Sequence, residues 1–279
     1  MVCYGIGTVY TPPANRGKGY AGHMMRLLHW VLASPDRLSA IFPEEWGSPP
    51  ARVESAGNGQ CSVLWSDVGL DFYRRCGPTP NSEGWTVTGA ASTIWRVSKG
   101  SSGSLTKTES KWLWLDEAGA LQLWERDARN LTEEARLADG DSDAFVIPPW
   151  NDVATYQTRR HQFVLALQGI DFRCWGVKTV EEDDAISFAT WTIDYPSRTL
   201  MITRLDCQVA LFAELLDLIV GVAQEHGMDK VEIYNLPTSL QSVATAAGGI
   251  TGERDEHLPS LMWYGNENAS NISWLLNER

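Results

Sequence analysis

The chain has 279 residues, of which 43% are hydrophobic, and carries a formal net charge of −12 at pH 7. A chain of this length and apolar content can bury one large core or two smaller ones. The acidic excess disfavours binding to nucleic acid, because the phosphate backbone is also negatively charged. No apolar run is long enough to cross a membrane, and no leader precedes the first expected strand, so we expect a cytoplasmic protein without a membrane partner.

The cysteines and histidines give no sign of a disulfide framework or of a metal site. The five cysteines are odd in number and none is spaced C-x-x-C, which favours a reducing compartment. The histidines lack the paired spacing of metal ligands, so we expect no bound metal. Cys76 is expected to be a packing residue and not a reactive thiol, because the C-terminal end of a helix disfavours the thiolate.

The segment from Val9 to Met25 is expected to run from a strand through a glycine-rich turn into an amphipathic helix. Gly17 and Gly19 flank Lys18, so successive backbone N–H groups can converge on one point at the positive end of the helix dipole. The pattern predicts a diphosphate site; the alternative is an ordinary strand-to-helix turn. A Walker loop is excluded because no Ser or Thr follows Lys18.

The next elements complete a first group along the chain. Apolar residues at helical spacing predict that the first helix continues to Leu32 and ends at Ser34-Pro35. Residues 62–77 are expected to form a strand end, a polar cap, a short helix and a glycine stop, and Ser92–Val97 a closing strand. Polar residues 98–111 predict a linker, and residues 112–143 an acidic helix that bridges two domains.

The last part repeats the order of strand, helix and strand. The expected helices cover Thr155–Leu167 and Ala210–His226, and the expected strands cover Cys174–Thr179, Ala185–Asp194, Thr199–Asp206 and Val231–Tyr234. Residues 205–208 stand where a second phosphate loop would lie, but they contain an aspartate and no glycine, so we expect this part to be non-catalytic.

Three aspartates of the last part have two interpretations. Asp183, Asp184 and Asp194 either contact a cationic amino acid or belong to a solvated surface.

The turn at Arg16-Gly17-Lys18-Gly19-Tyr20-Ala21 resembles the [Gln/Arg]-x-x-Gly-x-[Gly/Ala] loop of the GNAT family of acyl-CoA N-acyltransferases. The resemblance implies that acetyl-CoA is the cosubstrate. It also implies that the amides of Gly17, Lys18, Gly19, Tyr20 and Ala21 bind the pyrophosphate, that Arg16 belongs to this site, and that Val9 and Tyr10 form the strand edge along the pantetheine.

The sequence Phe72-Tyr73-x-x-x-Gly77 is similar to the end of the last GNAT helix. This resemblance makes Tyr73 the general acid that protonates the departing thiolate. The alternative is that Phe72 and Tyr73 are ordinary core and helix-surface aromatics.

Three further segments occur together as in the fungal lysine N-acetyltransferase group, the Lyc1-like proteins. They are Thr11-Pro12-Pro13, Ser66-Asp67-Val68-Gly69 and residues 258–265. The resemblance implies an α/β (α+β) fold with GNAT-like mixed sheets flanked by helices. It divides the chain into the C-terminal half of a GNAT domain (1–97), a linker with a bridging helix (98–143) and a GNAT-like C-terminal domain (144–279). It also implies a first domain truncated at its N-terminus.

The function implied by the resemblance is acetyl transfer from acetyl-CoA to a small-molecule amine, with the ε-amine of free lysine as the acceptor. No general base can be named, because no acidic residue lies between Met1 and Thr11. The alternative is a truncated, catalytically impaired GNAT-like module that binds a partner or forms a homo-oligomer through an exposed sheet edge.

Overall fold

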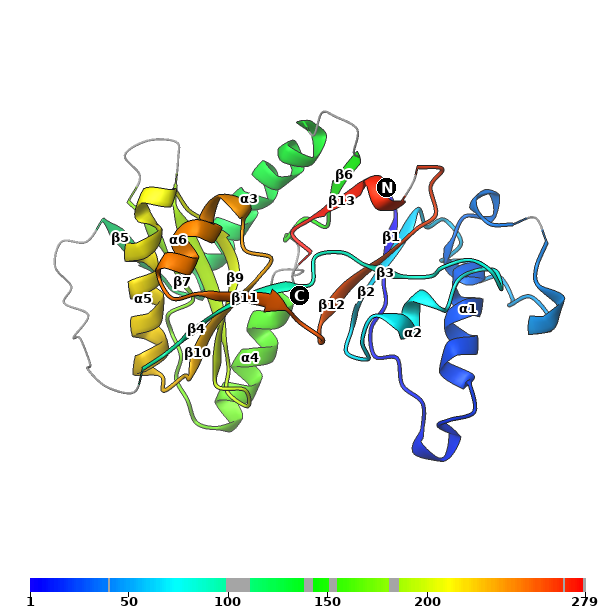
Figure 1. Ribbon diagram of the computed structural model, residues 1–279, viewed down its shortest axis with the longest axis horizontal. Coiled ribbons are helices and arrows are strands. Elements are labelled where there is room, and N and C mark those ends of the chain that lie inside the picture. Colours follow the sequence, from blue (N-terminus) through cyan, green and yellow to red (C-terminus); the bar gives the residue numbers. More distant parts are fainter. Residues whose placement is uncertain are drawn as a thin grey trace.

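The computed structural model describes residues 1–39, 41–98, 111–137, 143–150, 155–180, 186–267 and 269–277. These residues form a four-stranded and a seven-stranded sheet that lie side by side, each with its own helices, and a separate two-stranded ribbon (Figure 1). The predicted α/β class, with mixed sheets flanked by helices, is confirmed.

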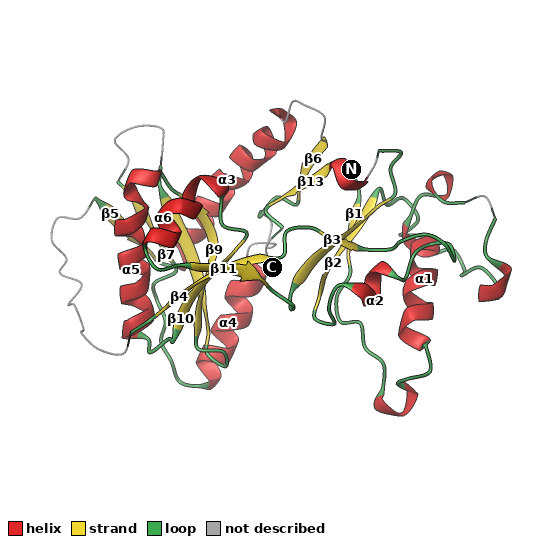
Figure 2. Cartoon of the chain, viewed as in Figure 1, coloured by secondary structure: helices red, strands yellow, loops and turns green. Residues whose placement is uncertain are grey.

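The first sheet has four strands, and its helices lie toward one end of the molecule (Figure 1). The strand order is β1 (Cys3–Gly5), β2 (Cys61–Ser66), β12 (Leu258–Trp263) and β3 (Thr86–Val87), and the helices are α1 (Tyr20–Leu32) and α2 (Asp71–Arg74). Helix α1 buries Met25, His29 and Leu32, which recur at helical spacing. Between α1 and β2 the described chain consists of loops and short 3-10 turns (Figure 2).

The second sheet has seven strands and encloses the larger core. Its order is β11 (Ile250–Glu253), β4 (Ala91–Arg96), β10 (Lys230–Tyr234), β9 (Thr199–Asp206), β8 (Phe188–Asp194), β7 (Gly176–Thr179) and β5 (Trp112–Leu115). Helices α5 (Phe212–Glu225) and α6 (Gln241–Ala246) cover one face, and α3 (Glu117–Leu137) and α4 (Thr155–Leu167) cover the other (Figure 1). A two-stranded ribbon of β6 (Asp143–Val146) and β13 (Ile272–Leu275) lies beside α3.

Two strands pair in a different sheet from the elements that precede them along the chain. β12, from the end of the chain, pairs antiparallel with β2 and β3 in the first sheet. β4, which the sequence predicts as the closing strand of the first group, pairs instead with β10 and β11 in the second sheet. That prediction of sheet membership was wrong because Trp95 of β4 is buried in the second core, where its ring lies 6.1 Å from that of Phe212.

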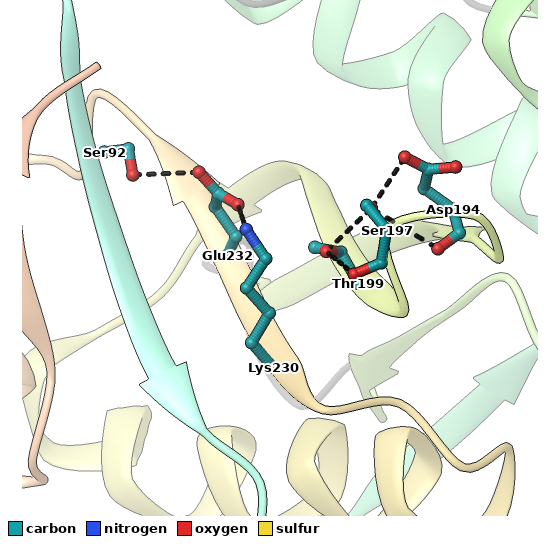
Figure 3. Close-up of polar contacts among 6 residues, drawn as sticks. All are labelled: Ser92, Asp194, Ser197, Thr199, Lys230 and Glu232. Atoms are coloured by element: carbon teal, nitrogen blue, oxygen red, sulfur yellow. Dashed lines mark hydrogen bonds and ion pairs between the residues drawn. The ribbon is translucent and has the colours of Figure 1, made fainter. Parts of the chain in front are cut away.

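A buried polar contact joins β4 to its neighbour β10 in the second sheet (Figure 3). The hydroxyl of Ser92 on β4 donates to Glu232 of β10 over 2.9 Å, and the ammonium of Lys230 lies 2.5 Å from the other oxygen of that carboxylate. Glu232 is only 7% exposed, so its charge must be paired inside the protein. The contact therefore stabilises β4 in this position.

Most other elements agree with the sequence. The helices at 20–32 and 155–167 and the strand at 199–206 lie where they were expected, within a residue of each end. Residues 112–143, expected as one helix, begin with β5, because Trp112 and Leu115 are buried as that strand pairs with β7. The segment 99–110 of the predicted linker lies outside the described residues.

The division of the chain into domains at residues 97 and 143 stays a prediction. The sheets draw on strands from both sides of residue 97.

Candidate functional site

The strands β1 and β2 run parallel and then diverge. Their register pairs Cys3 with Cys61 and Gly5 with Val63, and a last hydrogen bond of 2.8 Å joins the amide of Ile6 to the carbonyl of Val63. β2 continues to Ser66, while the first strand ends and Thr8 adopts a positive φ of 56°. Ligands bind preferentially where the carboxyl ends of neighbouring parallel strands separate.

Val9 and Tyr10 lie just beyond this divergence. The sequence predicts that they form a strand edge, but β1 ends at Gly5 and neither residue belongs to a strand. The expectation of a strand here was wrong, because the chain turns away from β2 at Thr8.

The glycine-rich loop has the backbone that the sequence predicts. Gly17 and Gly19 adopt φ angles of +74° and +81°, and no atom lies within 4 Å of where a Cβ would be placed on either residue. Glycine is thus required for backbone conformation and not for lack of space. Gly19 caps α1 without a side-chain hydrogen bond, and the first intrahelical bond is donated by His23 to the Gly19 carbonyl over 3.0 Å. The amides of the first turn therefore face outward and can bind an anion.

Two basic side chains are held against this loop. Arg16 donates through Nε to the carbonyl of Thr11 over 3.1 Å, and its guanidinium carbon lies 5.9 Å from the centre of the Tyr10 ring. Lys18 donates to the carbonyl of Ala14 over 2.9 Å. Both side chains add positive charge beside the helix N-terminus, which itself favours anions.

An apolar cluster lies between α1, β2 and α2, and Tyr73 of α2 packs against it. Val9 and Tyr73 both pack against the buried cluster formed by Met25, Leu64, Cys76 and Trp85. Two predicted site residues that are far apart in the sequence therefore contact the same buried cluster.

The hydroxyl of Tyr73 carries its proton at neutral pH. Burial, followed by the negative charge of Asp67, raises the pKa of Tyr73, so the phenol is protonated at neutral pH. No hydrogen bond of this hydroxyl is found to any described residue. The ring of Tyr73 meets that of Trp85 edge-on at 6.3 Å, which fixes its orientation.

A contact that the sequence does not reveal lies at the end of β2. Asp67 accepts from the backbone amide of His257 over 3.0 Å, and the Nδ1 atom of the same histidine lies 2.6 Å from its carboxylate. The two residues are 190 positions apart and meet only because β12 pairs with β2. No local pattern in the sequence could have indicated this pair.

A network of buried hydrogen bonds links α1 to the chain around it through His29. His29 contacts the carbonyl of Cys76 through Nε2 over 2.6 Å and the hydroxyl of Tyr264 through Nδ1 over 2.9 Å. Because the carbonyl can only accept, Nε2 carries the proton and Nδ1 accepts from Tyr264. Ser62 lies 3.0 Å from the Tyr264 oxygen and accepts from the indole of Trp85 over 3.0 Å.

The remaining predictions about reactive groups concern cysteines and metals. Burial raises the pKa of the Cys76 thiol, in agreement with a packing role. All five cysteines are free. Within the described ranges, no group of three or more His, Cys, Asp or Glu side chains is placed to hold a metal ion, and no helix could span a membrane.

The second sheet lacks a comparable loop between β9 and α5. There Asp206 and Gln208 line a cavity of about 160 Å³ together with Asp127 of α3, which forms a two-bond ion pair with Arg204 at 2.7 and 3.1 Å. Burial raises the pKa of Asp206; the charge of Arg204 opposes this shift, and the charge of Asp127 adds to it. A carboxylate here is unfavourable for a phosphate ligand; that this part of the chain is non-catalytic stays a prediction.

The aspartates that were considered as amino-acid contacts divide into two groups. Asp194 accepts from Ser197 over 2.7 Å within the β8–β9 turn (Figure 3). Asp183 and Asp184 lie outside the described residues.

The family follows from a comparison with known protein families. A family described as the LYC1 GNAT-like C-terminal domain matches residues 96–279, which is roughly two thirds of the chain. The chain therefore belongs to the family of proteins with this LYC1 GNAT-like domain. The matched region covers all strands of the second sheet except β4, of which it contains only the last residue.

Several solved structures are similar over most of the chain. A GCN5-related N-acetyltransferase from Kribbella flavida is 14% identical with a TM-score of 0.41, and the match covers 94% of this chain and 53% of that one. The corresponding enzyme from Sphaerobacter thermophilus is 13% identical with a TM-score of 0.44, over 93% of this chain and 72% of that one. A third, from Anabaena variabilis, is 14% identical with a TM-score of 0.43, over 94% and 55%.

The chain spans about half the length of the Kribbella and Anabaena proteins. No curated protein matches the chain significantly.

Proposed function

We propose that this protein is an acetyl-CoA-dependent N-acyltransferase whose cosubstrate site lies in the first sheet. The observation that carries the proposal is the glycine-rich loop that follows the divergence of β1 and β2 and leads into α1, whose first amides have no side-chain cap. Gly17, Lys18, Gly19, Tyr20 and Ala21 would bind the pyrophosphate through their backbone amides. Arg16 and Lys18 would add favourable charge.

The acetyl end of the cosubstrate would lie on the inner side of the loop, beside Val9 and Tyr73. The acceptor nitrogen attacks the thioester carbonyl carbon, a C–N bond forms and the C–S bond breaks. The thiolate leaves and takes the phenolic proton of Tyr73, which is protonated at neutral pH. The nitrogen loses one proton to solvent as the amide forms, and Tyr73 regains one proton from solvent.

We propose a small-molecule amine as the acceptor, with the ε-amine of free lysine as the first candidate. With a solution pKa of about 10.4, this amine costs about 4.6 kcal/mol to deprotonate at pH 7. A desolvating pocket or a base must supply this free energy. The resemblance to lysine N-acetyltransferases supports lysine and a role in lysine catabolism. The free cysteines support a cytoplasmic location.

A second candidate function rests on the edge of the first sheet. β1 pairs with β2 on one side, and no described strand pairs with its other side. An unpaired edge can add a strand from another chain, which supports a binding or homo-oligomeric module. Sedimentation measurements test the homo-oligomeric form of this alternative, because a strictly monomeric protein would exclude it.

The experiment that tests the proposal combines titration calorimetry with an acetyl-transfer assay on lysine. We expect acetyl-CoA to bind, and Tyr73→Phe to lower kcat about 100-fold while the Kd for acetyl-CoA stays within twofold. Tyr156→Phe, at an exposed tyrosine of α4, serves as the control and should change neither value. Absence of acetyl-CoA binding to the folded protein would refute the proposal.

A further inference from the structure

Two cysteines from different parts of the sequence lie opposite each other on neighbouring strands. Cys3 of β1 and Cys61 of β2 are register partners in the parallel pair, although helix α1 lies between them in the sequence (Figure 1). Neighbouring strands are about 4.7–4.9 Å apart, and a disulfide spans Cα–Cα distances of about 4.4–6.8 Å. The backbone of this pair therefore already has the spacing that a disulfide needs.

The two side chains lie on the same face of the first sheet. Cys61 is fully buried in a cluster with Val63, and Cys3 packs against the same cluster. The two thiols also interact directly, because a hydrogen bond with Cys61 lowers the pKa of the Cys3 thiol. The sulfur atoms are therefore already neighbours in the reduced protein.

Cys3 is the more reactive of the two thiols. It is half-buried, so a dissolved reagent can reach it, and its lowered pKa favours the thiolate, which is the reactive form. The hydrogen bond to Cys3, followed by burial, raises the pKa of Cys61. Burial also raises the pKa of the other three thiols, Cys76, Cys174 and Cys207. An accessible thiol of low pKa beside a second, resolving thiol is typical of a redox-sensitive pair.

We propose that Cys3 and Cys61 form a reversible redox modification site, at which a small-molecule disulfide such as oxidised glutathione converts the two thiols into an intramolecular disulfide. The Cys3 thiolate attacks one sulfur of the reagent, the S–S bond of the reagent breaks, and one glutathione thiolate leaves. The Cys61 thiolate then attacks the Cys3 sulfur of the mixed disulfide, and the second glutathione thiolate leaves. Two cysteines are oxidised, one glutathione disulfide is reduced to two thiols, and the two cysteine protons pass to the leaving thiolates.

The disulfide secures the attachment of β1. This strand pairs with β2 through three residue pairs, and the last hydrogen bond before the strands diverge joins Ile6 to Val63. Because Cys3 precedes that divergence, the bridge ties the two strands together without closing the space between their separated ends. In a reducing compartment such a bond is transient and responds to the redox state.

The test measures formation of the bridge in the full chain and needs neither acetyl-CoA nor an acceptor. The reduced protein is equilibrated with mixtures of reduced and oxidised glutathione, alkylated, and digested with trypsin. Cleavage after Arg16 and Arg52 places Cys3 and Cys61 in separate peptides, so the bridge is detected as a linked pair. We expect the linked pair to form, the number of free thiols to fall by two, and dithiothreitol to reverse both changes.

The fold should favour the bridge strongly. We expect the equilibrium constant for its formation to be at least about tenfold larger in the folded protein than in urea, because only the fold holds the two thiols together. The bridge should raise the melting temperature by about 5–10 °C, since it closes a long loop of the unfolded chain.

Three variants assign the step to these residues. Cys3→Ser should abolish the bridge and the rise in melting temperature. Cys61→Ala should stop at the mixed disulfide of Cys3 with glutathione. Cys207→Ser is the matched control and should keep the bridge, because Cys207 is also half-buried but its thiol donates to the carbonyl of Gln208 over 3.2 Å. Melting curves of the reduced proteins establish that each variant is folded.

Three results would overturn the proposal. They are a wild type that glutathione does not modify, a wild type in which glutathione stays on Cys3, and a bridge that forms no more readily in the folded protein than in urea. None of these results bears on acetyl-CoA binding, so the proposed function stands or falls by its own experiment.

Discussion

Acidification should destabilise this protein through His29, a histidine that the fold keeps neutral. The side chain is fully buried, stacked on Trp85 at 4.2 Å, and hydrogen-bonded through both ring nitrogens. Burial lowers its pKa from 6.5 to about 4, although the bond to the Cys76 carbonyl partly opposes this shift. Between these two pKa values the unfolded chain binds a proton that the folded protein does not.

The sign and size of the effect follow from this difference. Because the folded-state pKa is the lower one, the stabilisation is fully present above pH 6.5 and is lost as the pH falls toward 4. The shift corresponds to about 3 kcal/mol at about 1.36 kcal/mol for each pKa unit. For a domain of marginal stability this is a large fraction of the total.

The assay is urea unfolding at several pH values between 4 and 7, for the wild type and two variants. His29→Gln can still donate to the Cys76 carbonyl but cannot titrate, so the free energy of unfolding should depend less on pH, by about 3 kcal/mol over this range. Tyr264→Phe also destabilises the network, by about 1–3 kcal/mol, because Nδ1 loses its donor. It keeps the titrating histidine and therefore the pH dependence. Parallel curves for the wild type and His29→Gln would refute the reasoning.

Two further predictions concern the loop and the second core. Gly19→Ala should destabilise the protein by about 1–2 kcal/mol, because φ is +81° there. Gly5→Ala is the control and should not destabilise it, because φ at Gly5 is not positive and the space around it is also open. Equal melting temperatures for the two variants would contradict this prediction. Arg204→Ala should cost about 3–5 kcal/mol in urea unfolding, because Asp127 is 2% exposed and loses its ion-pair partner. The exposed Arg173→Ala is the control for the second variant, with an expected cost under about 1 kcal/mol.

Several features of the site could be read from the sequence because their causes are local. Gly17 and Gly19 are the residues that tolerate positive φ, and both adopt it. The first helix could be bounded because its apolar spacing begins after the loop and ends before Ser34-Pro35. Each of these properties depends on residues within one or two turns of chain.

Other features were decided only by the tertiary structure. The sequence correctly indicates a strand near residues 91–96, but not that Trp95 finds its buried site in the second core. In the same way, Asp67 meets His257, and His29 meets Tyr264, only after β12 inserts beside β2. Strand pairing and burial are set by contacts between residues far apart along the chain, for which a local pattern carries no information. The sequence by itself therefore determined the loop and its helix, while the fold determined which distant residues surround them.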